Sequence, residues 1–170
     1  MLRDEFLGGI GDPAQLLRML VRLLVASLLG GLIGLERQYE GKAAGTRTHM
    51  LVALGAALFI MVPMEMATDV ASLSRVIQGI AAGIGFLGAG TILKLSDLHE
   101  IKGLTTAASV WMTAAIGVAV GAGRIGLALL SVGLGLIILY VLHRVEIWCT
   151  TGKEKAKHNK DRRADPGSKA

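Results

Sequence analysis

Two apolar segments rich in glycine, residues 75–93 and 103–121, constrain the fold of this chain more than any other feature. In a soluble helix each glycine costs about 1 kcal/mol relative to alanine. In lipid, small residues instead let two helix backbones approach closely, so that packing and interhelical hydrogen bonds hold the helices together. The segments therefore predict two transmembrane helices that pack through glycine and alanine faces. The alternative is a glycine-rich helix pair in a soluble core.

The composition of the rest of the chain favours the membrane interpretation. Of the 170 residues, 52% are hydrophobic, 18% are charged and 23 are glycine. Eighteen helical residues rise about 27 Å, close to the ~30 Å hydrocarbon core of a bilayer. We therefore expect an all-α fold, a polytopic membrane helix bundle of about five transmembrane helices packed through Gly/Ala faces. The expected spans are residues 13–38, 48–62, 76–93, 104–121 and 125–142.

Capping residues and prolines indicate where these helices begin and end. Asp12 and Pro13 suit the start of the first helix, as N-cap and first helical residue. Pro63 is expected to close the second helix. A loop over residues 64–74 should then lead to the third helix, and a polar break over residues 94–102 should separate the third from the fourth.

Small residues recur four positions apart within several of the expected helices, which places them on one helix face. Such faces are typical of close helix packing in membranes. The glycines expected to pack helix against helix are Gly30, Gly34, Gly79, Gly83, Gly85, Gly88, Gly90, Gly117 and Gly121.

The last part of the chain changes in character after His143. We expect residues 1–143 to form the transmembrane domain and residues 144–170 to form a basic, disordered cytoplasmic tail, because the tail has almost no apolar residues. The formal net charge of +5 arises mainly there. Contact with anionic lipid headgroups, at about 1 kcal/mol per basic residue, suits this tail better than a nucleic acid partner.

The lysines and arginines between the spans predict the orientation. They gather on the side of the tail, in the connection over residues 36–47 and in the polar break, while the other side carries few. Positive charge favours the cytoplasm. The chain should therefore be a multi-pass protein of the bacterial cell inner membrane, with a periplasmic N-terminus and a cytoplasmic C-terminus.

Polar and ionisable residues inside or beside the spans are the candidates for function. Arg22 lies deep enough to need a partner, because an arginine at mid-bilayer costs about 2.5–3.5 kcal/mol. Glu36 is expected either to pair with Arg47, fixing the turn, or to contribute to a cation site. The candidates for an ion site or a regulatory contact are Arg22, Glu36, Arg37, Arg47, Thr48, Arg75, Gln78, Thr105, Thr106 and Ser109.

The hydroxyl residues of the fourth span raise two alternatives. Thr106, Ser109 and Thr113 share one helix face, by their spacing of three and four residues. That face either lines a polar pathway or hydrogen-bonds neighbouring helices, at roughly 0.6 kcal/mol per contact. No catalytic triad, phosphate loop or metal-spaced cluster is evident, since the four histidines lie in different segments and Cys149 is the only cysteine. We expect no enzyme activity, no cofactor and no metal site.

Four sequence blocks resemble the signatures of the MgtC/SapB family: LLGGLIGLERQ, AGTRTHMLVALGAALF, GIGFLGAGTIL and GLTTAASVWMTAAIGVAVG. The resemblance covers residues 16–142, in order. It implies a bacterial inner-membrane protein linked to magnesium limitation and homeostasis, acid stress adaptation and virulence. It also implies a regulator of other membrane complexes, such as the ATP synthase or P-type transporters. In longer members a soluble C-terminal domain follows, and we expect none here.

The resemblance also singles out motif positions. They are Gly34, Glu36, Arg37, Gly45, Arg47, Thr48, Gly55, Gly83, Gly85, Phe86, Gly88, Gly90, Gly103, Leu104, Thr105, Thr106, Ala107, Ser109 and Trp111.

Three hypotheses follow for what the chain does. The first is a regulator that contacts another membrane complex, with the lipid bilayer and a second copy of the chain as further partners. The second is a small cation or proton channel or transporter, in which Arg22, Glu36, Arg47 and the hydroxyls of the fourth span line the route. The third is a structural membrane scaffold.

Overall fold

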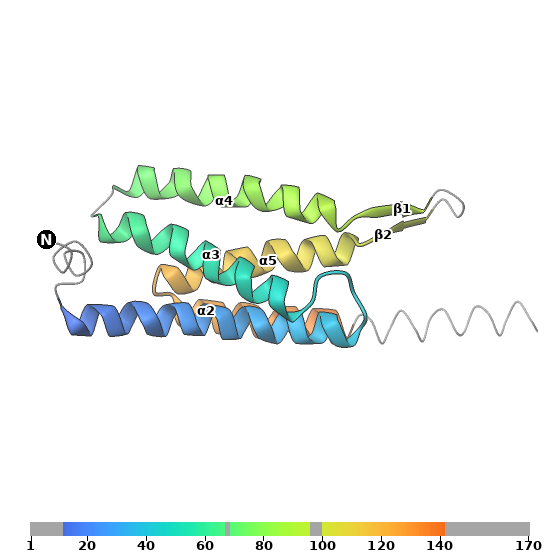
Figure 1. The fold of residues 1–170 in the computed structure, drawn as a ribbon, viewed down its shortest axis with the longest axis horizontal. Helices are drawn as coiled ribbons and strands as arrows, with labels where there is room; N and C mark the ends of the chain where they lie inside the picture. Colours follow the sequence, from blue (N-terminus) through green and yellow to red (C-terminus); the bar gives the residue numbers. More distant parts are fainter. Residues whose placement is uncertain (1–11, 67–68, 96–99, 142–170) are drawn as a thin grey trace, which may run out of the picture. The chain divides into compact units, whose positions relative to one another are not determined.

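A computed structural model of the protein describes residues 12–66, 69–95 and 100–141 (Figure 1). The chain divides into two compact units, Met1–Gly133 and Leu134–Ala170. In chain order the elements are α2 (Pro13–Tyr39), α3 (Thr46–Glu65), α4 (Val70–Gly90), β1 (Leu93–Leu95), β2 (Glu100–Lys102), α5 (Leu104–Gly121) and the helix Ile125–Val141. The second unit contributes only residues 134–141 to the described part, as the end of that last helix. The expected domain boundary at residue 143 and the basic tail lie outside the described residues.

The predicted all-α membrane bundle is confirmed. Four helices, α2 to α5, are long and apolar enough to cross a membrane, and Ile125–Val141 is a shorter apolar helix. In the described part of the chain, the only strands are β1 and β2, which pair antiparallel with Leu93 opposite Lys102 and Leu95 opposite Glu100. The chain is therefore a multi-pass membrane protein, and its hairpin occupies the polar break expected between the third and fourth spans.

The second helix does not end where the sequence predicted. Pro63 lies inside α3, which continues to Glu65. A proline inside a helix removes one backbone hydrogen bond and crowds the preceding turn. Because α3 ends two residues later, the loss is confined to the final turn, and the helix tolerates it.

The third helix begins earlier and ends earlier than predicted. The expected loop over residues 64–74 is wrong, because α4 starts at Val70 with Asp69 as its N-cap. The carboxylate of Asp69 accepts a hydrogen bond from the backbone N–H of Ser72 at 2.6 Å, which satisfies one free donor of the first turn. At its other end α4 stops at Gly90, so that the chain can enter the hairpin.

Gly103 joins the hairpin to α5 in a conformation that favours glycine. Its φ is +96°, in the left-handed region, and a Cβ at this position would lie 1.9 Å from the carbonyl oxygen of Thr91. The close return of the hairpin onto the end of α4 therefore depends on the missing side chain.

The core forms where α3 packs against α2. A Cβ on Gly30 would lie 2.5 Å from the carbonyl oxygen of His49, and one on Gly34 would lie 2.6 Å from the Cα of Thr46. These two glycines, four residues apart on α2, therefore let the first turn of α3 rest directly on the α2 backbone.

A second glycine pair brings α5 against the other part of α3. A Cβ on Gly117 would lie 2.3 Å from the carbonyl oxygen of Ala53, and one on Gly121 would lie 2.6 Å from that of Ala57. In both cases the obstacle is backbone, which cannot move aside as a flexible side chain does. α3 is thus held between α2 and α5 by backbone-to-backbone contact.

α4 packs differently from the other three spans. Figure 1 shows α2 and α4 on opposite sides of α3 and α5. Of the 21 residues of α4, all described, Gly88 alone is buried, with its Cβ position 3.5 Å from the Cβ of Ala107 in α5. Among the described residues, the predicted packing of the other α4 glycines has no counterpart, because α4 diverges from α3 along an open groove. No atom of another element lies within 4 Å of a Cβ built at Gly79, Gly83, Gly85 or Gly90.

Candidate functional site

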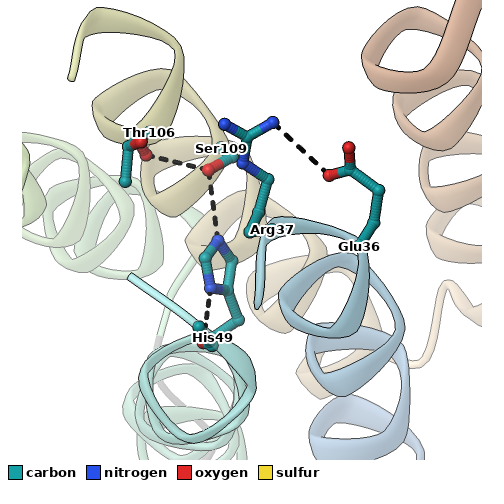
Figure 2. Close-up of polar contacts among 6 residues, drawn as sticks. Glu36, Arg37, His49, Thr106 and Ser109 are labelled. Atoms are coloured by element: carbon teal, nitrogen blue, oxygen red, sulfur yellow. Dashed lines mark hydrogen bonds and ion pairs between the residues drawn. The ribbon is translucent and has the colours of Figure 1, made fainter. Parts of the chain in front are cut away.

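A buried histidine lies at the centre of a polar cluster between α3 and α5 (Figure 2). His49 is fully buried, in the first turn of α3, where Gly30 and Gly34 allow the close approach of α2. Its Nδ1 atom lies 2.9 Å from the carbonyl oxygen of Gly45, the N-cap of α3. Its Nε2 atom lies 3.1 Å from the hydroxyl oxygen of Ser109. Both ring nitrogens therefore have polar partners inside an otherwise apolar bundle.

The hydroxyl residues of α5 extend this cluster along one helix face. Ser109 donates a hydrogen bond to the carbonyl oxygen of Thr106 at 2.8 Å, and Thr113 donates one to that of Ser109 at 2.8 Å. All three side chains are buried, on the helix face that they were predicted to share. Ser109 forms the hydrogen bond to a neighbouring helix that one alternative expected, whereas Thr113 bonds within α5.

Two charged residues of α2 lie beside the histidine. Arg37 is only 4% exposed, and its Nη1 atom lies 3.4 Å from the Oε2 atom of Glu36, which is 17% exposed. Burial of an ion is costly, so this pair depends on mutual neutralisation. In the described part of the chain, the Nε atom of Arg37 and the hydroxyl of Thr46 are buried without a hydrogen-bond partner. Two buried polar groups in the cluster therefore still lack a hydrogen-bond partner.

Of the two alternatives for Glu36, the pairing with Arg47 is not seen among the described residues, where Glu36 pairs with its sequence neighbour Arg37. Arg47 and Thr48 are both exposed. Successive residues of an α-helix are 100° apart, so the side chain two positions before the inward-facing His49 points away from the core. Two of the candidate residues in this motif therefore lie outside the cluster.

Arg22 has the partner that its depth in the span demanded. Its guanidinium Nη1 atom donates a hydrogen bond to the carbonyl oxygen of Gly121 at 3.1 Å, at the C-terminal end of α5. A cation at this end of a helix satisfies a free carbonyl and complements the helix dipole. Arg22 therefore caps the C-terminal end of α5 and joins α2 to α5, and it is not part of the histidine cluster.

The remaining polar candidates lie on the exposed surface of the helices. Arg75 is exposed and donates a hydrogen bond to the hydroxyl of Ser72 at 2.8 Å, one turn away on α4. Gln78 and Thr105 are also exposed. Among the described residues, no group of three histidine, cysteine or acidic side chains that could hold a metal ion is present.

His49 is the residue that the sequence reasoning missed. The four histidines lie in different segments, so neither a catalytic triad nor metal spacing singles out His49. A different signal is present, since His49 lies in an expected span, directly before an apolar run, and an ionisable residue within a span is a functional candidate by itself. Its neighbourhood of glycines, in GTRTHM and in the facing GGLIG block, indicates the close helix contact that buries it.

Comparison with known proteins gives consistent matches. The model of the MgtC family matches residues 23–148. Protein SrpB of Synechococcus elongatus is 46% identical over 136 residues, covering 74% of this chain and 75% of SrpB. YhiD of Escherichia coli K12 is 42% identical over 133 residues, covering 74% of this chain and 61% of YhiD. Protein MgtC of Brucella abortus is 51% identical over 100 residues, covering 59% of this chain and 41% of that protein. No solved structure matches.

Proposed function

This chain belongs to the MgtC family, and we propose that it is an inner-membrane regulator that acts by binding a helix of another membrane complex. It matches three quarters of SrpB but smaller shares of YhiD and of the Brucella MgtC. We therefore extend the activity of those whole proteins to this chain only as part of the proposal.

One observation carries the proposal, namely the open groove between α3 and α4. The groove has a volume of about 590 Å³ and is lined by apolar residues. Gly55 on α3 and Gly79 and Gly83 on α4 expose their backbones there, with no atom of another element within 4 Å of their Cβ positions. Close backbone approach between small-residue faces is the way helices associate in lipid. A partner helix that fills this groove would complete the packing that α4 lacks.

The partner class follows from the family. The family resemblance points to transport or ATP-synthesis machinery, either an ATP synthase or a P-type transporter. We infer a link to magnesium limitation, with acid stress and virulence as the settings in which such regulation acts. The chain would act without enzyme activity or a cofactor, since it needs only to occupy a site on its partner. We place its N-terminus in the periplasm and its C-terminus in the cytoplasm, from the lysine and arginine distribution.

A small cation or proton transporter is the second candidate. The buried charge of Arg37 and the partly buried charge of Glu36 favour it, because ionisable groups inside a membrane often mark an ion route. A relative also bears the name "Putative magnesium transporter YhiD". Against it stands the closure of the cluster, in which the histidine and hydroxyls are buried and bonded to backbone carbonyls.

Site-directed crosslinking in native membranes tests the regulator. A photoreactive residue at Phe59, which lines the groove, should crosslink to a subunit of an ATP synthase or a P-type transporter. Gly83→Leu should abolish the crosslink by filling the groove. Gly126→Leu is the matched control, since Gly126 is also exposed without an atom of another element within 4 Å but lies outside the groove. Crosslinking that survives Gly83→Leu would contradict the groove as the docking site.

Ion flux in sealed proteoliposomes tests the alternative. Magnesium, potassium and proton reporters should show no flux above that of empty liposomes if the protein is a regulator. Flux that is well above background, and that is lost in Glu36→Gln protein shown to be folded and inserted, would instead make the protein a small transporter.

A further inference from the structure

The geometry of the histidine cluster points to a proton-binding site, and we propose that a proton bound at His49 locks α3 to α5 through Ser109. This inference concerns the interior of the bundle. It stands whether or not the groove binds a partner, because it uses none of the groove residues.

The number of hydrogen atoms in the cluster distinguishes the two protonation states of His49. Three contacts run in series: Gly45 carbonyl to His49 Nδ1, His49 Nε2 to Ser109 hydroxyl, and Ser109 hydroxyl to Thr106 carbonyl, at 2.9, 3.1 and 2.8 Å. Both ends of the series are carbonyl oxygens, which only accept. Three hydrogen bonds therefore require three hydrogens. A neutral imidazole and one hydroxyl supply two, whereas an imidazolium and one hydroxyl supply three.

The protonated state thus satisfies the whole series in the arrangement observed. His49 then donates from Nδ1 to Gly45 and from Nε2 to Ser109, and Ser109 donates to Thr106. Hydrogen bonds with a charged donor are roughly twice as strong as neutral ones. Since His49 belongs to α3 and Ser109 to α5, the proton strengthens the contact between two helices.

The neutral state leaves one contact of the series without a hydrogen. With the proton on Nδ1, which faces a carbonyl, Nε2 becomes an acceptor, and the Ser109 hydroxyl must turn from Thr106 toward the ring. The Thr106 carbonyl loses little, because a helical carbonyl also accepts a backbone N–H in the α-helix ladder. Loss of the proton therefore reverses the direction of the hydrogen bond that joins α3 to α5 and removes its charge.

Charged side chains near His49 act on a bound proton together with the hydrogen bonds to Gly45 and Ser109. From α2, the carboxylate of Glu36 attracts a second positive charge and the guanidinium of Arg37 opposes it. On α3, Arg47 is exposed. α5 contains no charged residue, and the single charge on α4, Arg75, lies fifteen residues, about 22 Å of helix, from the Gly90 end that meets α5 near Ala107. Burial of a charged imidazolium is costly and Arg37 opposes it, so the acceptors Gly45 and Ser109, together with the carboxylate of Glu36, must outweigh both effects for the proton to be held.

Nitrogen NMR on the full chain in lipid nanodiscs tests the site. With ¹⁵N-labelled histidine, the His49 signals are assigned as those missing in His49→Gln and are followed between about pH 5 and pH 9. The expected result is a change from an imidazolium with both nitrogens protonated at low pH to the Nδ1–H tautomer at high pH. A single tautomer that persists across the whole range in the unaltered protein overturns the proposal without any variant.

Two variants of α5 separate a proton site from simple packing. Ser109→Ala removes the acceptor of the Nε2 hydrogen and should lower the proton affinity of His49 by about 3- to 10-fold, since the charged hydrogen bond lost by the imidazolium is stronger than the neutral one lost by the imidazole. Ser109→Thr keeps the hydroxyl and should restore the affinity. Thr113→Ala is the matched control, because Thr113 is buried on the same face and bonds to the Ser109 carbonyl, not to the histidine. An unchanged affinity in Ser109→Ala, or an equal loss in Thr113→Ala, overturns the proposal.

Discussion

The Nε2 atom of His49 lies 3.1 Å from the hydroxyl oxygen of Ser109, sixty residues further along the chain, and this contact joins α3 to α5 inside the bundle. Both side chains are buried, at 0% and 5% exposure. In the part of the chain that the structure describes, this hydrogen bond lies amid glycine and alanine packing. We expect its energy to be measurable apart from that packing.

A double-mutant cycle on His49→Ala and Ser109→Ala should give a coupling energy of about 0.6–1.7 kcal/mol, the range found for hydrogen bonds between membrane helices. The measurement is unfolding by SDS titration in mixed micelles. The cycle of His49→Ala with Thr113→Ala is the control, and those two changes should add within about 0.5 kcal/mol because the side chains share no contact. Full additivity in both cycles would mean that the His49–Ser109 contact contributes nothing.

Gly117→Ala should destabilise the fold by about 1–3 kcal/mol, since the new methyl group would meet the Ala53 backbone at 2.3 Å. Gly83→Ala should be neutral or stabilise by up to about 1 kcal/mol, because its Cβ position is open and alanine favours the helix. SDS unfolding of both variants checks the contrast. Equal effects would contradict the assignment of α4 as the loosely packed helix. Gly117 is consequently a poor site for testing partner binding, since a change there damages the fold first.

Glu36→Gln should destabilise the protein by about 3 kcal/mol, because it leaves the buried guanidinium of Arg37 without its counter-charge. Arg47→Gln should change the stability by less than about 0.5 kcal/mol, since Arg47 is exposed. Unfolding midpoints in the same detergent mixture compare the two variants. The double variant Glu36→Gln with Arg37→Gln should recover part of the loss. A larger effect at Arg47 than at Glu36 would show that the ion pair lies elsewhere.

Arg22→Gln should cost about 1.5–3 kcal/mol, the worth of a charged hydrogen bond to the last carbonyls of α5. Arg18→Gln is the control on the same helix face. Arg18 lies 3.8 Å from Asp12 with both side chains more than half exposed, and such pairs contribute about 0–1 kcal/mol. Hydrogen exchange at the C-terminal turn of α5 should rise in Arg22→Gln and stay unchanged in Arg18→Gln. Equal exchange in the two variants would exclude the capping role.

The spans were predictable because hydropathy and helix length are local properties. All five expected spans overlap the observed helices, and the start of the first at Asp12 and Pro13 agrees with the structure, where Asp12 accepts a hydrogen bond from Ala14. The differences lie at helix ends. α3 continues past Pro63, and α4 begins before its predicted start, with Asp69 as its N-cap. The end of a helix depends on which turn its surroundings stabilise.

The candidate site was predictable only in part. Glu36, Arg37, Thr106 and Ser109 belong to the cluster, whereas Arg47, Thr48 and Thr105 face outward. Motif resemblance names residues that are close in sequence, and half of any helical stretch points away from the core. His49 was missed because its importance arises from a partner on another helix.

By itself, the sequence determined that this chain is a bundle of apolar helices, because the length and hydropathy of each segment leave the bilayer as its only suitable surroundings. It also determined that small residues would govern the packing. Which glycines do so was decided by the tertiary structure: Gly34 and Gly117 meet backbone, and Gly83 meets open space. The same holds for His49 and Ser109, whose contact exists because α2 and α5 approach α3 closely. Such distances between helices are properties of the assembled bundle, and no single segment encodes them.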